Sequence, residues 1–310
     1  MTTPYEPLRA ARPRFLPLRG IRYHLHEWGD IATAAPERPL LVLLHGWMDV
    51  GASFQFMVDA LARAEGFERA VVAPDWRGFG LSQGPATDSY WFPDYLGDLD
   101  ALLDKLLEKA APGAAVDLVG HSMGGNVAMS YAGVRPRRVR RLVNLEGYGM
   151  PATDPAQAPA RLVRWLDELK SPQSMRDYDD LDAVAARLRA NNPRLAADQA
   201  AWLAPHWSRL TPSGRRELLA DAAHKRVNPV PYRVDETLAA WRLIAAPLLF
   251  VEGDASGPDA TFRGRYPAAE FDARLAAVPR CERATLADAG HMLHHDQPAA
   301  LAALLARFLA

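Results

Sequence analysis

The chain has 310 residues, of which 49% are hydrophobic and 24% are charged. This balance is typical of a globular protein with a large buried core, and it excludes a disordered or fibrous chain. Lys and Arg number 36 and Asp and Glu number 37, so the formal net charge is −1. Such a chain has no long-range field that would attract polyanions or anionic lipid. We therefore expect neither nucleic acid nor a membrane as a partner.

Cys281 is the single cysteine, which excludes an intrachain disulfide framework and a cysteine-cluster metal site. The first twenty residues contain no apolar stretch of about 7–15 residues that could form the core of a signal peptide. No segment reaches the roughly 18 consecutive apolar residues of a membrane span. These features predict a cytoplasmic protein.

The predicted elements begin with two segments, 14–20 and 21–29, whose alternation of apolar and polar residues suggests an antiparallel hairpin. Short apolar runs that end in turn residues then predict buried, parallel strands. These runs are 39–46, 70–76, 116–122, 141–147 and 247–254. Between them lie segments with helical spacing, the clearest being 94–110. Its leucines fall on one face, at positions Leu99, Leu102, Leu103, Leu106 and Leu107.

Strands that alternate with helices predict an α/β fold with a mostly parallel sheet covered on both faces. The length allows two domains, or one domain with an inserted subdomain. Strand-like runs disappear between residues 151 and 243, a segment that is interrupted by prolines and contains helical fragments. We expect a core made of residues 1–150 and 244–310, with a helical cap inserted at 151–243.

One motif in this pattern carries chemistry. The predicted strand at 116–120 leads directly into Gly120-His121-Ser122-Met123-Gly124, a G-x-S-x-G pattern between a strand and a helix. The glycines allow the strand and the helix to approach closely around a strained serine, whose hydroxyl is then exposed near the positive end of a helix. The motif predicts Ser122 as a nucleophile.

A serine hydroxyl needs a neutral imidazole to take its proton. Among nine histidines, the best placed is His291, in a loop that follows the last predicted strand and precedes a helix near Pro298. We expect His294 and His295 to be solvated or structural neighbours. These three histidines and Asp296 also resemble a metal-binding cluster, but no further group of ligands accompanies them. We expect no metal and no cofactor.

Together these motifs resemble the serine hydrolases of the α/β-hydrolase fold, in the branch of capped esterases, epoxide hydrolases and haloalkane dehalogenases. The resemblance spans most of the chain and follows the family order. The matching segments are 45–47 (His-Gly-Trp), 75–82 (Asp-Trp-Arg-Gly-Phe-Gly-Leu-Ser), 120–125 (Gly-His-Ser-Met-Gly-Gly) and 290–291 (Gly-His). The resemblance implies an oxyanion hole made by the backbone N–H groups of Trp47 and Met123.

The acid that would complete a triad is ambiguous. Relatives often carry it in a Gly-x-x-Asp arrangement after the seventh strand, but that spacing from Gly253 reaches Ser256, and the acid in the loop is Asp254. Other relatives carry it after the sixth strand, where Glu146 stands here. A carboxylate beside a buried strand needs a partner such as an imidazolium, so we favour Glu146, with Asp254 and then Glu252 as alternatives.

The remaining candidates are residues that support loops and residues that line the substrate pocket. Asp75 and Arg77 are expected to brace loops, and the pair His45-Gly46 to support the oxyanion loop. The expected apolar pocket consists of His45, Tyr148, Trp165, Trp202 and Trp207.

A serine nucleophile forms an acyl-enzyme, whereas epoxide hydrolases and dehalogenases of this fold use an aspartate. We therefore expect hydrolysis of a small carboxylic ester with an apolar part. The alternatives are a C–C bond hydrolase, a thioesterase, an amidase, a lyase such as a hydroxynitrile lyase, or a non-catalytic small-molecule receptor.

Overall fold

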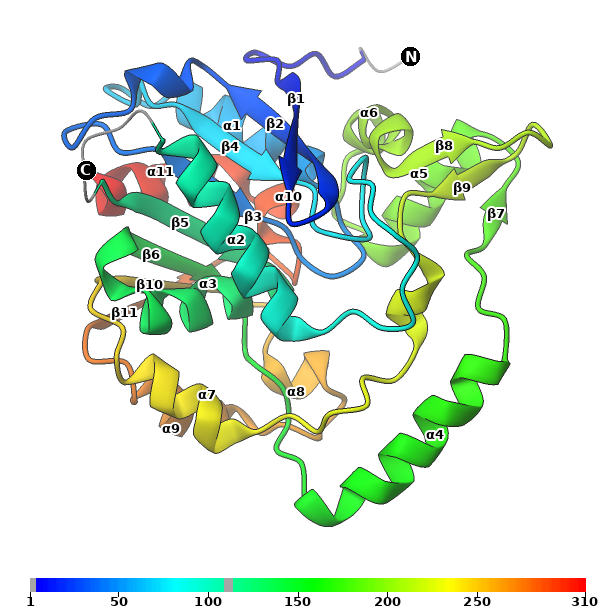
Figure 1. The fold of residues 1–310 in the computed structure, drawn as a ribbon. Helices are drawn as coiled ribbons and strands as arrows, with labels where there is room; N and C mark the ends of the chain where they lie inside the picture. Colours follow the sequence, from blue (N-terminus) through cyan, green and yellow to red (C-terminus); the bar gives the residue numbers. More distant parts are fainter. Residues whose placement is uncertain (1–3, 109–113) are drawn as a thin grey trace.

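The computed structural model describes residues 4–108 and 114–310. Within these ranges, an eight-stranded sheet in the order β1-β2-β4-β3-β5-β6-β10-β11 runs through the centre of the molecule (Figure 1). The strands are β1 (Arg12–Leu18), β2 (Ile21–Trp28), β3 (Leu41–Leu44), β4 (Val71–Pro74), β5 (Val116–His121), β6 (Val139–Leu145), β10 (Leu248–Gly253) and β11 (Cys281–Leu286). Strands β1 and β2 form the expected antiparallel hairpin, β2 pairs antiparallel with β4, and the other neighbours pair parallel.

The strands are buried on both faces because helices cover the sheet on either side. Successive residues of β3 point to opposite faces: Leu41 and Leu43 join one hydrophobic cluster, while Val42 and Leu44 join the other. One face is covered by α1 (Gln55–Ala62) and α11 (Pro298–Leu309). The other is covered by α2 (Phe92–Leu106), α3 (Met123–Val134), α7 (Val234–Trp241) and α9 (Ala268–Leu275).

Helix α2 shows why the leucine pattern is informative. Leu99, Leu102, Leu103 and Leu106 are buried, and Leu107 packs partly against the same cluster. The helix also begins with Pro93 at an N-terminal position, where the missing N–H has no cost. The end of the predicted helix, at residues 109–110, lies outside the described residues.

The segment between β6 and α7 contains both helices and strands. Its helices are α4 (Ala158–Lys170), α5 (Leu181–Asn191) and α6 (Ala197–Trp207). A small antiparallel sheet in the order β7-β9-β8 consists of β7 (Asp177–Tyr178), β8 (Ser208–Leu210) and β9 (Arg216–Leu218). In Figure 1 this sheet lies with α5 and α6 to one side of the central sheet, and α4 extends below them. These strands of two or three residues are too short to produce a recognisable alternation.

The structure differs from the expected insertion at its C-terminal end. Helix α7 packs against α3, and Trp241 lies in the core cluster of the main sheet. A Cβ added at Gly133 of α3 would lie 2.1 Å from the carbonyl oxygen of Ala240, so the two helices are in close contact. The packing thus places α7 with the flanking helices, although its residues fall inside the predicted range 151–243.

Two short helices, α8 (Pro258–Thr261) and α10 (Leu293–Asp296), follow β10 and β11 respectively. Among the described residues, no helix combines the length and apolar character needed to cross a membrane. The predicted α/β architecture, with a mostly parallel sheet between two layers of helices, is confirmed.

Candidate active site

Ser122 lies in the sharp turn between β5 and α3. Its backbone has φ 51° and ψ −114°, a region that non-glycine residues rarely adopt. The turn is held by hydrogen bonds, because the Ser122 N–H donates to the Leu145 carbonyl (2.8 Å) and the Asn126 N–H donates to the Ser122 carbonyl (3.0 Å). The strained serine therefore sits at the N-terminus of α3, as the G-x-S-x-G motif predicts.

The glycines of this motif are required by close contacts between backbone segments. A Cβ at Gly124 would lie 2.0 Å from the carbonyl oxygen of Leu44, and one at Gly120 would lie 2.3 Å from the carbonyl oxygen of Gly124. Because these neighbours are backbone atoms, they cannot move aside as a flexible side chain could. The elbow thus depends on glycine at both positions.

Glu146 and His291 form the second part of the site. Glu146 follows β6, with φ 55°, and its side chain is almost completely buried. His291 Nδ1 donates to Glu146 Oε2 at 2.7 Å. Oε1 accepts from the Gly253 N–H at 2.8 Å, and Oε2 also accepts from Ser256 Oγ at 2.7 Å. Three donors therefore fix the carboxylate, and the proton on Nδ1 leaves His291 Nε2 with its lone pair free.

The alternative acids lie elsewhere. Asp254 is exposed and accepts a hydrogen bond from the Ala289 N–H at 3.2 Å, so it contacts the loop before His291 and not the imidazole. Glu252 accepts from Arg283 Nη2 at 2.8 Å. The geometry supports the preference for Glu146 over both.

His121 connects the elbow to the histidine loop. Its Nε2–H donates to the His291 carbonyl at 2.7 Å, and the centroids of the two imidazole rings are 4.8 Å apart. Burial, together with the positive charge that His291 can carry, lowers the pKa of His121 well below its ordinary value. His121 is therefore a neutral residue that holds the His291 backbone beside Ser122. No pattern in the sequence indicates this role.

The loop after β3 also approaches the serine. A Cβ at Gly46 would lie 3.3 Å from Ser122 Cβ, so the backbone that leads into Trp47 passes directly over the elbow. The Trp47 side chain is 54% exposed, and Met123 is the first residue of α3. The two backbone N–H groups predicted to bind an oxyanion thus belong to the loop above Ser122 and to the helix that starts behind it.

His45 is a structural residue in this arrangement and does not line a pocket. It is completely buried, its Nδ1–H donates to the Gly46 carbonyl at 2.8 Å, and its Nε2 accepts from the Trp76 N–H at 2.9 Å. Burial lowers its pKa to about 4, so the ring is neutral. Both ring nitrogens are engaged, which explains why His45 cannot serve as a pocket residue as we expected.

Asp75 and Arg77 brace loops, in the manner expected. Asp75 accepts from the Gly51 N–H, the Leu81 N–H and His24 Nδ1, at 2.8, 2.9 and 2.8 Å. The two nitrogens Nε and Nη2 of Arg77 donate to Asp98 at 2.5 and 2.6 Å.

The aromatic residues predicted to form one pocket are in three places, although Trp202 and Trp207 of α6 pack against the same small hydrophobic cluster. Tyr148 is buried in the main core against Phe250 and Phe271. Trp165 of α4 donates to Ser89 Oγ at 2.7 Å, whereas Trp207 at the end of α6 donates to Ser53 Oγ at 3.3 Å. Trp202 packs against Tyr5 and Phe56. The expectation of a single shared pocket fails because α4 and α6 lie apart in the insertion (Figure 1).

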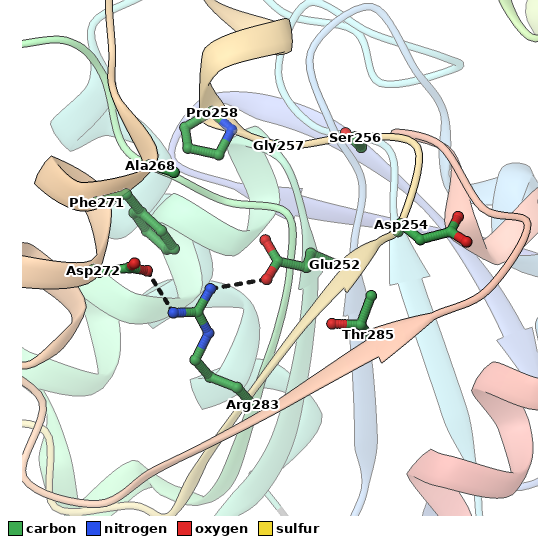
Figure 2. Close-up of a pocket in the computed structure, with 11 residues that line it drawn as sticks. Glu252, Asp254, Ser256, Gly257, Pro258, Ala268, Phe271, Asp272, Arg283 and Thr285 are labelled. Atoms are coloured by element: carbon green, nitrogen blue, oxygen red, sulfur yellow. Dashed lines mark hydrogen bonds and ion pairs between the residues drawn. The ribbon is translucent and has the colours of Figure 1, made fainter.

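A surface pocket of about 270 Å³ opens at the end of β10. Figure 2 shows that Arg283 is held in it between Glu252 and Asp272, with Ser256 and Asp254 on the loop above. The guanidinium of Arg283 is thus already paired with two carboxylates, and Pro258, Ala268 and Phe271 contribute the apolar part of the lining.

Ser256 and Tyr148 also lie near Glu146, and Ser256 shares the carboxylate oxygen Oε2 with His291. Burial, followed by the negative charges of Glu146 and Glu252, raises the pKa of the Tyr148 hydroxyl above its ordinary value. Ser256 occupies the position that the Gly-x-x-Asp spacing reaches from Gly253, so the sequence contained a signal for its place near the triad. The spacing alone does not show that Ser256 binds to Glu146.

The histidines near the end of the chain do not form the metal-binding cluster considered for residues 291–296. His291 faces Glu146, and Asp296 accepts hydrogen bonds from the Gly290 N–H (2.8 Å) and Asn192 Nδ2 (2.7 Å). His294 and His295 are buried, which makes them structural neighbours and not solvated ones.

Comparison with known proteins identifies the family of the chain. The model of the alpha/beta hydrolase family (Abhydrolase_6) matches residues 41–304. The chain belongs to the alpha/beta hydrolase family. The fold, the family and a hydrolytic activity predicted from the motifs are thereby confirmed.

Relatives in this family act on different bonds. The chain is 30% identical to 3-hydroxybutyrate-oligomer hydrolase of Cupriavidus necator over 295 residues, which are 91% of this chain and 90% of that protein. It is 36% identical to 2-hydroxymuconate semialdehyde hydrolase of Pseudomonas sp. over 144 residues, or 44% of each chain. It is 31% identical over 180 residues to a serine hydrolase-like protein of Danio rerio, covering 56% of this chain and 52% of that protein. The chain thus spans about half the length of the last two relatives.

Two solved structures illustrate the likeness in fold. The thioesterase domain of the curacin biosynthetic pathway is 27% identical, with a TM-score of 0.79 and coverage of 96% of this chain and 99% of that domain. An esterase from Mycobacterium tuberculosis is 20% identical, with a TM-score of 0.66 and coverage of 96% and 91%, a likeness that concerns the fold alone.

Proposed function

We propose that the chain is a serine-type hydrolase of small carboxylic esters that works through an acyl-enzyme. The observation that carries this proposal is the hydrogen bond of 2.7 Å from His291 Nδ1 to Glu146 Oε2, on a loop that His121 ties to the Ser122 elbow. A strained serine, an imidazole and a buried carboxylate in this order are the parts of an acyl-transfer triad.

In this mechanism Ser122 Oγ attacks the ester carbonyl while His291 Nε2 takes the hydroxyl proton. Glu146 keeps the proton on Nδ1 and stabilises the imidazolium that forms. The Trp47 and Met123 N–H groups stabilise the oxyanion, and one such donor contributes about 10²–10³ in rate. His291 then protonates the leaving alcohol, and water activated by the same imidazole hydrolyses the acyl-enzyme.

Two considerations support an ester as the substrate. A serine attacks an acyl carbon and gives an ester intermediate that water cleaves, which suits acyl transfer better than epoxide or halide displacement. One relative, which aligns with 91% of this chain and 90% of its own length, is named 3-hydroxybutyrate-oligomer hydrolase. Oligomers of 3-hydroxybutyrate are joined by ester bonds. We therefore propose short oligoesters of hydroxy acids as the first substrates to test.

Cleavage of a C–C bond is the second candidate function. It is favoured by the identity of 36% with 2-hydroxymuconate semialdehyde hydrolase, which extends over 44% of each chain. The same nucleophile and base would serve that reaction, so a substrate comparison must separate the two.

We also propose that the segment preceding α7 acts as a cap over the substrate. Leu162, Val163 and Leu166 of α4 are exposed and lie on one side of that helix. Next to this side, Arg161 Nε donates to the Asn228 carbonyl at 2.5 Å and Trp165 Nε1 donates to Ser89 Oγ at 2.7 Å, and these bonds hold the helix in place. This leaves an apolar helix surface available for an apolar substrate part.

The test is a panel of substrates assayed with wild type and Ser122→Ala. It contains p-nitrophenyl esters of increasing acyl length, the linear dimer and trimer of 3-hydroxybutyrate, and 2-hydroxymuconate semialdehyde. The proposal expects turnover of esters by wild type and a loss of about 10⁶-fold in Ser122→Ala. Turnover of the semialdehyde with no ester hydrolysis would replace the ester proposal with the C–C function.

A further inference from the structure

Three buried side chains meet near Ser122, and each comes from a segment of the candidate active site: the loop after β3, the end of β5 and α10. Asp49 follows the His45-Gly46-Trp47 segment, His121 directly precedes Ser122, and His294 lies three residues after His291. One ligand atom from each lies within 4.8 Å of the other two, and Asp49 Oδ2 is 3.9 Å from His294 Nε2. Two imidazoles and a carboxylate therefore converge from three separate segments.

Several side-chain atoms of these residues have no hydrogen-bond partner within the described part of the chain. They are Asp49 Oδ2, His121 Nδ1 and both ring nitrogens of His294, of which Nε2 lies nearest to Asp49. The three residues are only 3%, 2% and 0% exposed. Buried polar atoms normally have partners, because leaving them unpaired costs free energy. Unpaired atoms that converge at one point indicate a bound species.

The far sides of two of these groups are fixed. His121 Nε2–H donates to the His291 carbonyl at 2.7 Å, which leaves the lone pair of Nδ1 directed away from that bond. Asp49 Oδ1 accepts from the Val50 N–H at 2.8 Å and from the Ser53 hydroxyl. Metal-binding histidines and carboxylates are typically oriented by such bonds from their second polar atom.

A second cluster of the same composition also contains an unpaired buried atom, His24 Nε2, but its carboxylate is already engaged. His24, His26 and Asp75 also lie within 4.8 Å of one another. However, Asp75 already accepts from His24 Nδ1 and from two backbone N–H groups. Its carboxylate is thus saturated, which makes this cluster a suitable control.

We propose that Asp49, His121 and His294 bind a divalent transition-metal ion with the coordination chemistry of zinc. Two imidazole nitrogens and one carboxylate oxygen are a common set of protein ligands for zinc, and a water molecule completes a tetrahedron. Metal–ligand bonds of about 2.0–2.1 Å place tetrahedral ligands about 3.3 Å apart. The 3.9 Å between Asp49 Oδ2 and His294 Nε2 therefore closes with a shift of about half an ångström.

The ion links the oxyanion loop, the elbow and the histidine loop without occupying Ser122, His291 or Glu146. The site is thus independent of the ester hydrolysis proposed above, and it departs from the sequence-based expectation of no metal. The competing occupant is an ordered water molecule that donates and accepts hydrogen bonds among the same atoms.

The test uses Co²⁺ as a spectroscopic probe for zinc. The full chain is expressed with Co²⁺ in the medium, so that the ion can enter during folding, and free metal is removed by gel filtration at about pH 8, where the ligands are deprotonated. Metal content and the visible d–d spectrum are then measured for wild type, Asp49→Asn, His294→Gln and the control His26→Gln. Circular dichroism checks that each variant folds.

The proposal expects one Co²⁺ per chain in wild type and in His26→Gln, with the intense d–d band of a four-coordinate ion. Asp49→Asn and His294→Gln are expected to weaken binding by at least about tenfold. Wild type that retains no cobalt, or a band that persists unchanged in both ligand variants, overturns the proposal. If the ligand variants do not fold, anomalous diffraction from wild-type crystals decides: a cobalt peak between the three side chains supports the site, and a water molecule there refutes it.

Discussion

Replacing Glu146 by Gln tests whether the Glu146 carboxylate orients His291, with almost no change in the shape of the side chain. Oε1 can remain a carbonyl oxygen that accepts from the Gly253 N–H, as at 2.8 Å in the wild type. The other position becomes an NH₂ group that faces His291 Nδ1 across the former 2.7 Å bond. Two donors cannot bond, so the imidazole must move its proton to Nε2, the atom that faces the reaction.

The expected loss follows from this change of tautomer. With the proton on Nε2, His291 cannot accept the Ser122 proton, and an equivalent acid-to-amide change in a serine triad lowers kcat by about 10⁴. This factor corresponds to about 5 kcal/mol of the activation barrier. The fold is affected much less: losing a charge-assisted bond to the buried carboxylate reduces the free energy of unfolding by about 1–3 kcal/mol.

The assay measures kcat and KM for a p-nitrophenyl ester, together with urea unfolding, for wild type, Glu146→Gln and Asp254→Asn. Asp254 is exposed and bonds to one N–H group, so its variant is expected to retain activity within about twofold of wild type. If Glu146→Gln keeps more than a tenth of the wild-type rate, or if Asp254→Asn is the variant that loses it, the assignment of the acid is refuted.

Three further predictions concern the same framework. Ser256 Oγ lies 2.7 Å from Glu146 Oε2, so an aspartate at position 256 should be able to reach His291. The double variant Glu146→Gly/Ser256→Asp is therefore expected to be at least about tenfold more active than Glu146→Gly. Equal kcat values for the two variants would show that an acid at 256 cannot reach His291. Gly124→Ala would place a Cβ 2.0 Å from the Leu44 carbonyl oxygen, so we expect a loss of more than about 4 kcal/mol in the free energy of unfolding, and unchanged urea midpoints would contradict the close contact. His224 is stacked between Phe79 and Tyr90, with ring centroids 3.9 and 3.7 Å away, and burial lowers its pKa from the ordinary 6.5 to about 4. Between pH 6.5 and about pH 4 the imidazole of the unfolded chain binds a proton and that of the folded chain does not. As the pH falls through this range, wild type should therefore lose free energy of unfolding relative to His224→Phe, by up to about 1.4 kcal/mol per pH unit. Parallel stability curves for the two proteins from pH 7 to pH 4 would refute this.

The main sheet could be predicted from the sequence because its strands are short apolar runs bounded by turn residues. All five predicted buried strands, the N-terminal hairpin and the leucine-rich helix are present, and the Ser122 elbow follows from its glycines. These features are local: each depends on residues within about ten positions of one another. Glu146 could be favoured for a related reason, because a carboxylate at the end of a buried strand requires a partner nearby.

The errors concern features that depend on long-range packing. His45 was assigned to the pocket, but its two ring nitrogens bond to Gly46 and Trp76, a pairing across 31 residues that no local pattern reveals. The tryptophans of the insertion are close in sequence, but Trp165 lies on α4, apart from Trp202 and Trp207 of α6. The cluster at Asp49, His121 and His294 has no local signature, because its members come from a loop, the end of a strand and a short helix that are far apart in the sequence. The division into core and cap, the cytoplasmic location and the site roles stay predictions.

The most direct test of the central claim is to identify the atom that carries the acyl group. Wild type and Ser122→Ala are incubated with diethyl p-nitrophenyl phosphate, which phosphorylates activated serines, and with a p-nitrophenyl ester under rapid acid quench, and their peptides are then analysed by mass spectrometry. We expect one phosphoryl or acyl group on Ser122 in wild type and none in Ser122→Ala. A labelled residue other than Ser122, or ester turnover by wild type without any covalent adduct, would contradict it.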